Sequence, residues 1–391
     1  VLYVAAHGAG QIVAIPKQGQ TVAALRGLNG PHSLTFRGSD LYVSVNDGVI
    51  RFPEATPVDF VIRSSGQRIL TVPSGGQHSS RTMDFGPDDR IYATAGSTCN
   101  FCVEADSRRA AMMRYDADGS NETLFAAGLR NTVSFAWHPV TGELWSVDNG
   151  GDGLGDDEPP EEIDILRAGG DYGWPDCVGQ RRGVNWGTGA RPSRCPATIG
   201  PELEMQAHSA PLGIAFYTGD RFPASYLNDA LIGFHGSWNR NVPTGYKVAR
   251  VRASSGRAAG MEDFLWGFFD PATRTASGRP VQAITGPDGA VYVSDDASGN
   301  IYRVSYEGPR ITPSGIVNRG AGIFELYGQR LGGASLYING MAADILYGGE
   351  NQINFVLPDA FINGSSDGLG GEVSIAAVNE KARDEAVFRL P

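Results

Sequence analysis

The sequence predicts an all-β protein made of a six-bladed β-propeller followed by a small β-sandwich. Three observations support this prediction: 53 glycines spread along 391 residues, short apolar segments separated by polar turns, and a motif that occurs six times between residues 1 and 306. Glycine-rich turns between short apolar runs are typical of β proteins. Because single hydrophobic cores stop growing at about 250–300 residues, a chain of this length is expected to contain two domains.

The repeat has a short apolar strand, a turn that is often Gly-Pro-Asp, a strand of the form x-Tyr/Trp-x-Ser/Thr and a third strand after a polar turn. The first copy lacks a leading strand, so we expect the last and first copies to share a blade. A sheet unit of this kind exposes its edges when alone, whereas radial repetition protects them. The motif-bearing segments of the six copies are Leu2–Ala5, Asp40–Ser44, Arg90–Thr94, Glu143–Val147, Ala230–Phe234 and Ala290–Ser294.

The repeat stops at Gly308, and residues 309–391 contain strands of a different pattern without His or Cys. About 80 residues of short strands are typical of a small β-sandwich. We therefore predict two domains, a propeller over residues 1–308 that carries the chemistry and an accessory domain over 309–391. The second domain has no catalytic constellation and is interpreted as a stabilising or docking module.

Charge and hydropathy exclude several classes of partner. The net charge is −11 and no basic run exceeds two residues, which disfavours nucleic acid and anionic membranes. No apolar run reaches 18 residues, so no membrane insertion is expected. The chain begins inside a strand-like segment without Met. We therefore expect that a leader has been removed and that the protein is periplasmic or secreted.

The four cysteines point to the same kind of compartment. Cys99 and Cys102 form a CxxC, and Cys177 and Cys195 are 18 residues apart. Val103 follows the CxxC where a c-type haem site needs His, and a zinc site would usually need a second CxxC. We predict two local disulfides, with four free thiols as the alternative.

Polar side chains precede the innermost strands of the predicted propeller at similar spacings. His78 and Arg130 lie seven residues ahead of the aromatic anchors Phe85 and Trp137. Because a propeller gathers these strand starts around one channel mouth, the residues are expected to form a ring. Arginines pair carboxylates, so the ring suits an anionic planar ligand, whereas the alternative is that each residue bonds a neighbouring backbone. The predicted ring contains His32, His78, Arg81, Arg130, Asn131, His208 and Arg279.

The fourth copy is followed by a loop, residues 148–162, that is rich in glycine and carboxylates. Carbonyl and carboxylate oxygens are the ligands that calcium prefers. The loop does not match the EF-hand pattern, and a solvated acidic loop is the alternative.

These segments together resemble the soluble pyrroloquinoline quinone (PQQ)-dependent sugar dehydrogenases, especially the sorbosone-dehydrogenase-like and aldose-dehydrogenase branch. The resemblance covers residues 1 to about 306 and is carried by segments in a fixed order. They are 76–81 (GQHSSR), 128–131 (GLRN), the 148–162 loop, 169–175 (GGDYGWP), 208–211 (HSAP), 235–240 (HGSWNR) and 278–280 (GRP).

The resemblance implies PQQ and calcium as cofactors and an aldose or sorbosone-like sugar as substrate. His78 would be the general base, Arg130 would stabilise charge on the quinone oxygen, and Asn131 would hydrogen-bond the cofactor. Gly150 and Gly151 would hold the activating calcium through backbone carbonyls, whereas Glu162 and the Tyr172 backbone match a second calcium site. The remaining residues expected to contact the cofactor are His208, Arg240 and Arg279.

The chain departs from the family pattern at three positions. Val281 stands where a second cofactor-binding arginine is expected, Arg240 is matched across a segment where the alignment slips, and His208 replaces a hydroxyl residue of the glucose-oxidising branch. These differences fit the sorbosone-like branch better. No haem motif is present, so electrons are expected to pass to an external acceptor. Residues 309–391 resemble an immunoglobulin-like module appended to secreted bacterial proteins.

Two other functions fit the same architecture. A metal-dependent lactone hydrolase would coordinate a central divalent metal through side chains, usually including a carboxylate. Asp84 is the only acidic residue on the predicted inner strands, which disfavours this function. A non-catalytic recognition propeller is the other alternative, because fold alone implies no chemistry.

Overall fold

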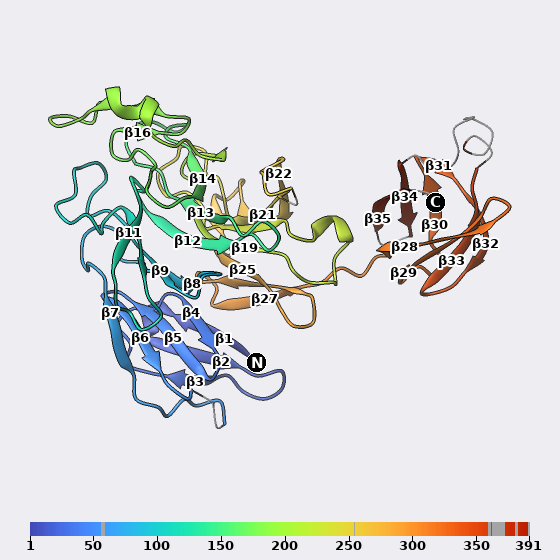
Figure 1. Cartoon of the computed structure of the whole chain (residues 1–391), viewed down its shortest axis with the longest axis horizontal. Coiled ribbons are helices and arrows are strands. Elements are labelled where there is room, and N and C mark those ends of the chain that lie inside the picture. The colour runs from blue at the N-terminus through green and yellow to red at the C-terminus, as the bar shows by residue number, and fades with distance from the viewer. Residues whose placement is uncertain (56–58, 254, 359–360, 362–371, 380–381, 390–391) are drawn as a thin grey trace.

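The chain is described by a computed structural model that covers residues 1–391 apart from 56–58, 254, 359–360, 362–371, 380–381 and 390–391. Its regular structure is almost entirely β-strand, as predicted. Figure 1 shows a group of sheets formed by the first 306 residues, joined by a short connection to a separate pair of sheets at the C-terminal end. The 3₁₀ helices are η1 (His7–Ala9), η2 (Pro192–Ala197) and η3 (Ala224–Tyr226).

The first three repeats form three sheets of antiparallel strands, with one further short strand added in parallel at the edge of the third sheet. In the second and third sheets the leading strand lies at one edge and the motif-bearing strand lies next to it. The strands of the first sheet are β1 (Leu2–Ala6), β2 (Gln11–Ile15) and β3 (Val22–Leu25); of the second, β4 (Leu34–Arg37), β5 (Asp40–Val45), β6 (Gly48–Phe52) and β7 (Gln67–Thr71); of the third, β8 (Met83–Phe85), β9 (Ile91–Ala95), β10 (Ala111–Tyr115), β11 (Thr123–Ala127) and β15 (Gly170–Asp171).

The last three repeats form three further sheets of the same order. Their strands are β12 (Thr132–Trp137), β13 (Leu144–Asp148), β14 (Glu161–Leu166) and β18 (Leu203–Met205) in the fourth sheet; β19 (Pro211–Phe216), β20 (Ala230–Phe234), β21 (Lys247–Val251) and β22 (Met261–Leu265) in the fifth; and β25 (Pro280–Thr285), β26 (Val291–Asp295) and β27 (Asn300–Val304) in the sixth. Two short hairpins lie outside these sheets, namely β16 (Cys177–Val178) with β17 (Arg182–Gly183) and β23 (Phe269–Asp270) with β24 (Thr275–Ala276).

The expectation that the first and last copies share a blade is wrong. The strands β1–β3 and β25–β27 form two separate sheets. The motif Leu2–Ala5 lies on β1, which is the edge strand of its sheet, whereas the same motif lies inside the sheet in the other copies. The first sheet therefore differs by having no strand in the leading position among the described residues.

The leading strands of successive sheets are tied to one another by side chains. Ser33 Oγ donates to Met83 O (3.1 Å), Thr82 Oγ1 donates to Val133 O, and Ser134 Oγ accepts from Ile214 N at 3.2 Å. These bonds place the starts of β8, β12 and β19 side by side, which is where the ring of polar residues was predicted.

The core of the propeller consists of layers between neighbouring sheets. Five buried clusters fill the five gaps from the first sheet to the sixth. The gap between the fourth and fifth sheets, for example, holds Trp145, Ile163, Ile214 and Ile232. The motif-bearing strands of the second to fifth sheets therefore bury side chains on both faces, which explains why they are nearly continuous apolar runs.

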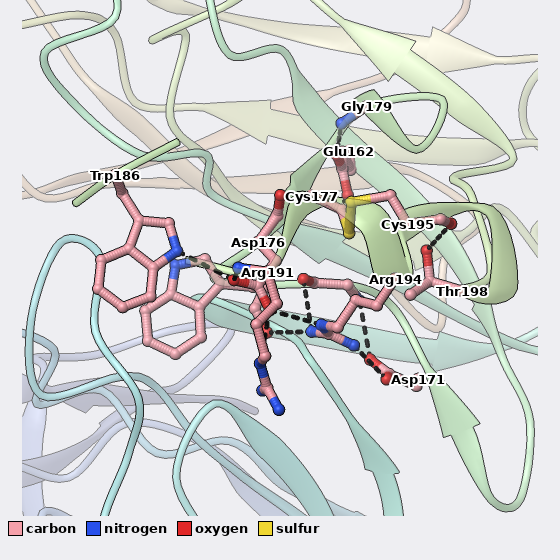
Figure 2. Close-up of a disulfide and its surroundings, with 12 residues drawn as sticks. Glu162, Asp171, Asp176, Cys177, Gly179, Trp186, Arg191, Arg194, Cys195 and Thr198 are labelled. Carbon is pink, nitrogen blue, oxygen red and sulfur yellow. Dashed lines mark hydrogen bonds and ion pairs between the residues drawn. A yellow bond between two sulfur atoms is a disulfide. The ribbon is translucent and has the colours of Figure 1, made fainter. Parts of the chain in front are cut away.

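An excursion from the fourth sheet is held by a disulfide between Cys177 and Cys195 (Figure 2). Beside it, the fully buried Asp176 carboxylate accepts from Arg194 Nε at 2.6 Å and from Trp186 Nε1 at 3.2 Å. The ion pair keeps this carboxylate charged, because the bonds from Arg191 N and Arg194 hold its pKa below the ordinary value against the opposing effect of burial. The excursion thus brings Tyr172 and Trp174 against the loop that follows β13.

Residues from 310 onward form two further sheets around a separate core. Phe324 and Phe355 of one sheet pack with Leu336 and Ile375 of the other, and all four are buried. This two-layer arrangement is a β-sandwich, whereas its immunoglobulin-like character remains a prediction. The strands are β28 (Arg310–Gly320), β29 (Ile323–Gln329), β33 (Gln352–Val356) and β32 (Asp344–Gly348), and in the second sheet β31 (Met341–Ala342), β30 (Ser335–Ile338), β34 (Glu372–Val378) and β35 (Arg383–Arg389).

Candidate functional site

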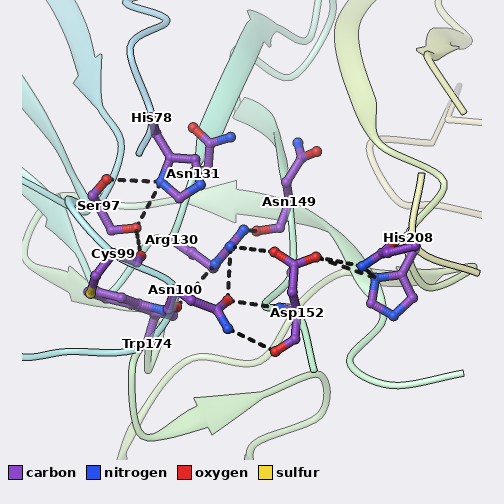
Figure 3. A network of polar contacts seen from close by, with 12 residues as sticks. His78, Ser97, Cys99, Asn100, Arg130, Asn131, Asn149, Asp152, Trp174 and His208 are labelled. Carbon is purple, nitrogen blue, oxygen red and sulfur yellow. Dashed lines mark hydrogen bonds and ion pairs between the residues drawn. The ribbon is translucent and has the colours of Figure 1, made fainter. Parts of the chain in front are cut away.

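Most of the predicted site residues lie on the loops that precede the leading strands or follow the motif-bearing strands, whereas Glu162 lies on β14 and Tyr172 follows β15. Figure 3 shows that His78, Arg130, Asn131, Asn149, Asp152 and His208 form one polar network. His78 lies on the loop before β8, and Arg130 and Asn131 lie immediately before β12. The gathering that the repeat predicted is therefore present for these residues.

The imidazole of His78 is oriented by Ser97. His78 Nδ1 lies 2.9 Å from the carbonyl oxygen and 2.9 Å from the hydroxyl oxygen of Ser97. Because a carbonyl oxygen only accepts, Nδ1 carries the proton and Nε2 is left with its lone pair. Within the described part of the chain no hydrogen bond to Nε2 is present, so this nitrogen is available to accept a proton.

The pKa of His78 favours the same state. Burial, followed by the charge of Arg130, lowers the pKa of His78 from 6.5 to about 4. The ring is therefore neutral at neutral pH, which is the form that a general base needs.

Arg130 is buried and held by three residues of the surrounding loops. Its Nε donates to Asn100 O (3.2 Å), its Nη1 to Asn149 O (3.1 Å), and its Nη2 to Asn100 Oδ1 (3.0 Å) and Asp152 Oδ2 (3.2 Å). A guanidinium has five N–H groups, so one N–H of Nη1 remains for a ligand. The cation is thus fixed in place and still able to donate.

Asn131 lies against His78. A side chain at Gly96 would meet Asn131 Oδ1 at 2.6 Å and His78 Cβ at 2.7 Å, so the lack of one allows the two residues to approach. Asn131 N donates to Asp148 Oδ1 at 2.6 Å, which fixes the backbone at the start of β12.

Two organising residues, Asp152 and Asn100, were not predicted. Asp152 Oδ2 accepts from Arg130, Asp152 Oδ1 accepts from Asn239 Nδ2 at 2.7 Å, and the Asp152 backbone bonds the Asn100 side chain at both ends. Asp152 belongs to the acidic loop singled out in the sequence, but its partners are 22 to 87 residues away, so spacing could not reveal the role. Asn100 lies between two cysteines, and nothing in the sequence marks it as a polar contact.

His208 joins this network from the opposite side. Its Nε2 donates to Gly155 O at 2.8 Å, and its Nδ1 accepts from Asn239 Nδ2 at 3.3 Å. The side chain is buried, with both nitrogens engaged by protein. His208 therefore holds the loop after β13 in place, and direct cofactor contact remains a prediction.

The two remaining predicted arginines differ in their free donors. Arg240 donates to the oxygens of Asp156, Ala207, Asp157 and Val242, which leaves one N–H. Arg279 donates to the carbonyls of His235 (2.9 Å) and Gly236 (2.6 Å), which leaves three.

Arg279 is therefore the better placed of the two to bind an anion, and Arg240 mainly ties the 156–157 loop to the propeller.

Two members of the predicted ring, Arg81 and His32, form hydrogen bonds with neighbouring groups of the protein. Arg81 is buried and donates to the carbonyls of Pro73, His78 and Ser80, and His32 Nδ1 pairs with Thr82 Oγ1 at 3.1 Å. Every nitrogen of the Arg81 guanidinium is engaged in this way. For Arg81 the alternative interpretation, a bond to a neighbouring backbone at a strand entry, describes the contacts, whereas His32 bonds a side-chain hydroxyl.

The four predicted metal ligands line one small cavity of about 20 Å³. A space of this size admits a single water molecule or ion. Gly150, Gly151, Glu162 and Tyr172 all border it, together with Arg130 and Asp148. The sequence assigned these ligands to two separate sites, whereas the structure brings them to the same place.

The carboxylates beside the cavity are arranged in a way that suits a cation. Asp148 and Glu162 lie directly opposite each other on β13 and β14, and Asp164 follows on the same face of β14. Burial and then the charges of Asp164 and Asp148 raise the pKa of Glu162, and both oxygens of the buried Asp164 are without a hydrogen-bond partner. Like charges placed opposite one another are destabilising, and a divalent cation with carbonyl and carboxylate ligands would relieve this repulsion. The residues present therefore fit calcium.

Glu161 braces the same loop from behind. Its carboxylate accepts from Gly150 N at 2.7 Å and from Ala210 N at 3.0 Å. Burial raises the pKa of Glu161 to about 7. This residue was not predicted, because only its neighbour Glu162 matched the family pattern.

The disulfide prediction is confirmed, because Cys99 is bonded to Cys102 and Cys177 to Cys195. No helix among the described residues has the length and apolar character needed to cross a membrane.

The chain is similar to several known proteins. A family described as TrAA12-like matches residues 3–307. An uncharacterized protein of Borreliella burgdorferi is 34% identical over 243 residues, which are 61% of this chain and 63% of that protein. A pyrroloquinoline quinone-dependent sugar dehydrogenase of Hypocrea jecorina is 26% identical over 264 residues, which are 56% of this chain and 60% of that protein. The chain thus spans about three-fifths of the length of these relatives.

The fold is shared with solved structures. The calcium structure of Trichoderma reesei Carbohydrate-Active Enzymes Family AA12 superposes with a TM-score of 0.66 at 21% identity, covering 76% of this chain and 88% of that one. At this identity the likeness concerns the propeller fold. Family membership rests on the match over residues 3–307, and the chain belongs to the TrAA12-like family.

Proposed function

We propose that the chain is a PQQ- and calcium-dependent sugar dehydrogenase that oxidises an aldose or a sorbosone-like sugar. Membership of the TrAA12-like family and the PQQ-dependent relative support the class of enzyme. The single observation that carries the chemistry is the His78 imidazole, because its Nδ1–H is committed to Ser97 O while Nε2 is free within the described chain.

His78 is the general base in this proposal. Nε2 takes the proton from the anomeric hydroxyl of the sugar, and the bond from Nδ1 to Ser97 O supports the imidazolium that forms. PQQ, when bound, would supply the two-electron acceptor for the hydride of the sugar. The low pKa of His78 means that the proton is released readily after each turnover.

Arg130, Asn131 and Arg279 are the proposed contacts to the anionic cofactor. Arg130 supplies a fixed positive charge and one free N–H beside His78, and a preorganised donor of this kind costs no reorganisation during reaction. Arg279 offers three free N–H groups for a carboxylate. His208 and Arg240 support the loop after β13, which carries the Arg130 partner Asp152, and we retain them as proposed members of the cofactor site.

Calcium is the proposed metal, held at the cavity bordered by Gly150, Gly151, Glu162 and Tyr172. There it would neutralise Asp148 and Glu162 and supply positive charge next to the cofactor. The two disulfides support a periplasmic or secreted protein. An external carrier would receive the electrons.

The test is a titration of the purified chain with PQQ and calcium, followed by dye reduction with a panel of aldoses and sorbosone. Saturable dye reduction that requires both PQQ and calcium is the expected result. Binding of PQQ without any turnover would contradict the sugar assignment, and no binding of PQQ would contradict the cofactor assignment.

The lactone hydrolase alternative has less support. Among the described residues, the one group of three or more His, Cys, Asp and Glu side chains close enough to share a metal is Cys99, Cys102 and Glu104. Both of these cysteines are oxidised to a disulfide. A central metal held by side chains is therefore not favoured.

A further inference from the structure

We propose that the loop closed by the Cys99–Cys102 disulfide is a positioning device for the reaction, and that Asn100 is its main positioning residue. The inference rests on the proposed function and extends it, because it assigns a role to residues that no family motif covers. Residues 96–110, which connect β9 to β10, contain neither helix nor strand. The disulfide lies within this irregular segment and joins the two residues that flank Asn100 and Phe101.

Asn100 uses all of its polar atoms except its backbone nitrogen to hold the site. Asn100 Oδ1 accepts from Arg130 Nη2 (3.0 Å) and from Asp152 N (2.8 Å), and Asn100 Nδ2 donates to Asp152 O (2.8 Å). Asn100 O accepts from Arg130 Nε (3.2 Å) and Trp174 Nε1 (3.2 Å). Two of the three guanidinium nitrogens of Arg130 are thus fixed by this one residue.

The same loop reaches His78 through Ser97. Ser97 Oγ donates to Cys99 O at 2.7 Å and lies 2.9 Å from His78 Nδ1. Ser97 O accepts the bond that sets the tautomer of His78. The backbone of the first cysteine therefore helps to fix the proposed base, while the residue after it fixes the proposed cation.

The loop also supports the metal cavity. A side chain at Gly151 would meet the Phe101 ring at 2.2 Å, so this ring packs directly on the glycine backbone. The four residues Cys99 to Cys102 consequently hold the cation through Asn100 and the base through Ser97 (Figure 3), and they pack on the proposed calcium-binding loop through Phe101.

The disulfide keeps these contacts in one arrangement. Without it, an irregular segment has many conformations, and the bonds of Asn100 must then offset the entropy of ordering it. Cys99 and Cys102 are half-buried, whereas Cys177 and Cys195 are only 4% and 1% exposed. The positioning disulfide is therefore the one that a reductant in solution can reach first.

The test compares Cys99→Ser/Cys102→Ser, Asn100→Ala and Asn100→Asp with Val103→Ala. Val103 is 61% exposed on the same loop and serves as the matched control. We expect the serine pair and Asn100→Ala to lower kcat about 10–100-fold, because displacement of a catalytic group by about 1 Å can cost 100-fold. The KM for sugar should stay within about twofold, and Val103→Ala should behave as the wild type. Asn100→Asp keeps both acceptor bonds of Oδ1 and should recover part of the loss.

A second readout does not depend on turnover. His78 is titrated by NMR in the protein without cofactor. Its pKa depends on burial, then on the charge of Arg130, the bond to the Ser97 backbone and the charges of Asp152 and Arg81. Release of Arg130 by Asn100→Ala should raise the pKa of His78, and Val103→Ala should leave it unchanged. A His78 titration and a kcat that are both unaffected by Asn100→Ala would overturn the inference.

This design separates the two proposals. If the wild type neither binds PQQ nor oxidises a sugar, the proposed function fails while the His78 titration still decides the positioning role. If the wild type is active and the loop variants are equally active, the proposed function stands and the positioning role fails.

If the serine variant does not fold, chemical reduction of the disulfide in the wild type tests the same proposal. Dithiothreitol breaks the S–S bond, forms two thiols and is itself oxidised to its cyclic disulfide; it is removed before the assay. We expect two thiols per chain and a loss of kcat of about 10–100-fold, reversed on reoxidation. Full activity with two thiols measured at Cys99 and Cys102 would overturn the inference.

Discussion

At the residue scale, the site depends on which nitrogen of His78 carries the proton. The bond to Ser97 O commits Nδ1, and burial beside Arg130 keeps the ring neutral. The resemblance to the soluble PQQ-dependent sugar dehydrogenases implied that His78 is the base, but the tautomer depends on a residue 19 positions away that no motif contains. Geometry thus adds the reason why this histidine can act.

Replacement of His78 by Ala tests this assignment. Turnover should fall by about 10²–10⁴-fold, the usual contribution of a general base, whereas PQQ affinity should remain close to that of the wild type. Dye reduction at saturating sugar and fluorescence titration with PQQ measure the two quantities. Unchanged turnover would mean that another group accepts the proton.

The pH dependence of kcat/KM provides a second test. A base must be deprotonated, so activity should rise with pH through an apparent pKa of about 4 instead of 6.5 and be level at neutral pH. Arg130→Met removes a positive charge that lowers the pKa of His78, so the profile of that variant should move to higher pH. A wild-type profile with an apparent pKa of 6.5 or above, insensitive to Arg130, would be inconsistent with His78 as the base.

Arg279 should contribute to cofactor affinity rather than to turnover. Arg279→Ala removes three free N–H donors; a charge-assisted hydrogen bond is worth about 1.5–3 kcal/mol, or about a 10–150-fold increase in the Kd for PQQ. Arg274→Ala is the control, since Arg274 is exposed and donates to Asn241 O. Equal Kd values for the two variants would place the cofactor elsewhere.

At the element scale, the strands could be predicted because the same sequence pattern occurs in each repeat. Segments such as Asp40–Ser44 are motif-bearing strands in the structure, and the starts of β8 and β12 lie together as the repeat required. What could not be predicted are bonds between loops, such as Asn100 to Arg130 and Asn239 to Asp152. These join segments of different sheets, and their partners depend on loop shape, which spacing in the sequence does not encode.

The β13–β14 pair shows how an element can create a site. Because side chains alternate across a strand, Glu162 and Asp164 share one face of β14, and register places Asp148 opposite Glu162. Burial raises the pKa of Asp148 to about 6 and that of Glu161, on the opposite face of β14, to about 7. Two adjacent strands thus concentrate charge that the fold alone does not neutralise.

Removal of calcium should therefore destabilise the protein in a pH-dependent way. A carboxyl with a raised pKa in the folded state binds more protons than in the unfolded state, so stability falls as pH rises through the folded pKa. The pKa values of His32 and His78 are lowered from 6.5 to about 4, so these residues make stability depend on pH only below about 6.5. Between pH 6.5 and 8.5 the pH dependence of stability therefore reports on the carboxylates. We expect EDTA to lower Tm more at pH 8.5 than at pH 6.5.

Thermal unfolding with EDTA or with added calcium at the two pH values measures this difference. Glu162→Gln should reduce the calcium-dependent rise in Tm, because it removes one carboxylate at the cavity. Glu158→Gln is the control, since Glu158 is on the same loop and pairs with Arg182 at the surface. An identical effect of EDTA at both pH values would contradict the role of the buried carboxylates.

At the scale of the whole molecule, stability is distributed over layers instead of one core. Each of the five clusters of the propeller touches two neighbouring sheets, so each sheet depends mainly on its neighbours. The C-terminal sandwich has its own cluster, whose buried members all lie between Ile311 and Phe388. The two parts therefore have the means to fold separately.

Among the described residues, two polar contacts between these parts lie away from the site. Arg310 Nη1 is 3.9 Å from Asp220 Oδ2, and Arg330 Nη2 donates to Arg221 O at 3.4 Å. Both partners lie between β19 and β20, whereas His78, Arg130 and Asp152 belong to the third and fourth repeats.

Removal of residues 309–391 should consequently leave turnover and PQQ affinity within about twofold of the full chain. The melting temperature of the propeller should fall by only a few degrees, because exposed ion pairs contribute about 0–1 kcal/mol each. Arg310→Ala in the full chain is the matched control for the contact alone and should change Tm less than the truncation does. If instead the truncated chain bound PQQ but lost turnover, the sandwich would have to reach the substrate side of the propeller, and its interpretation as an accessory module would be wrong.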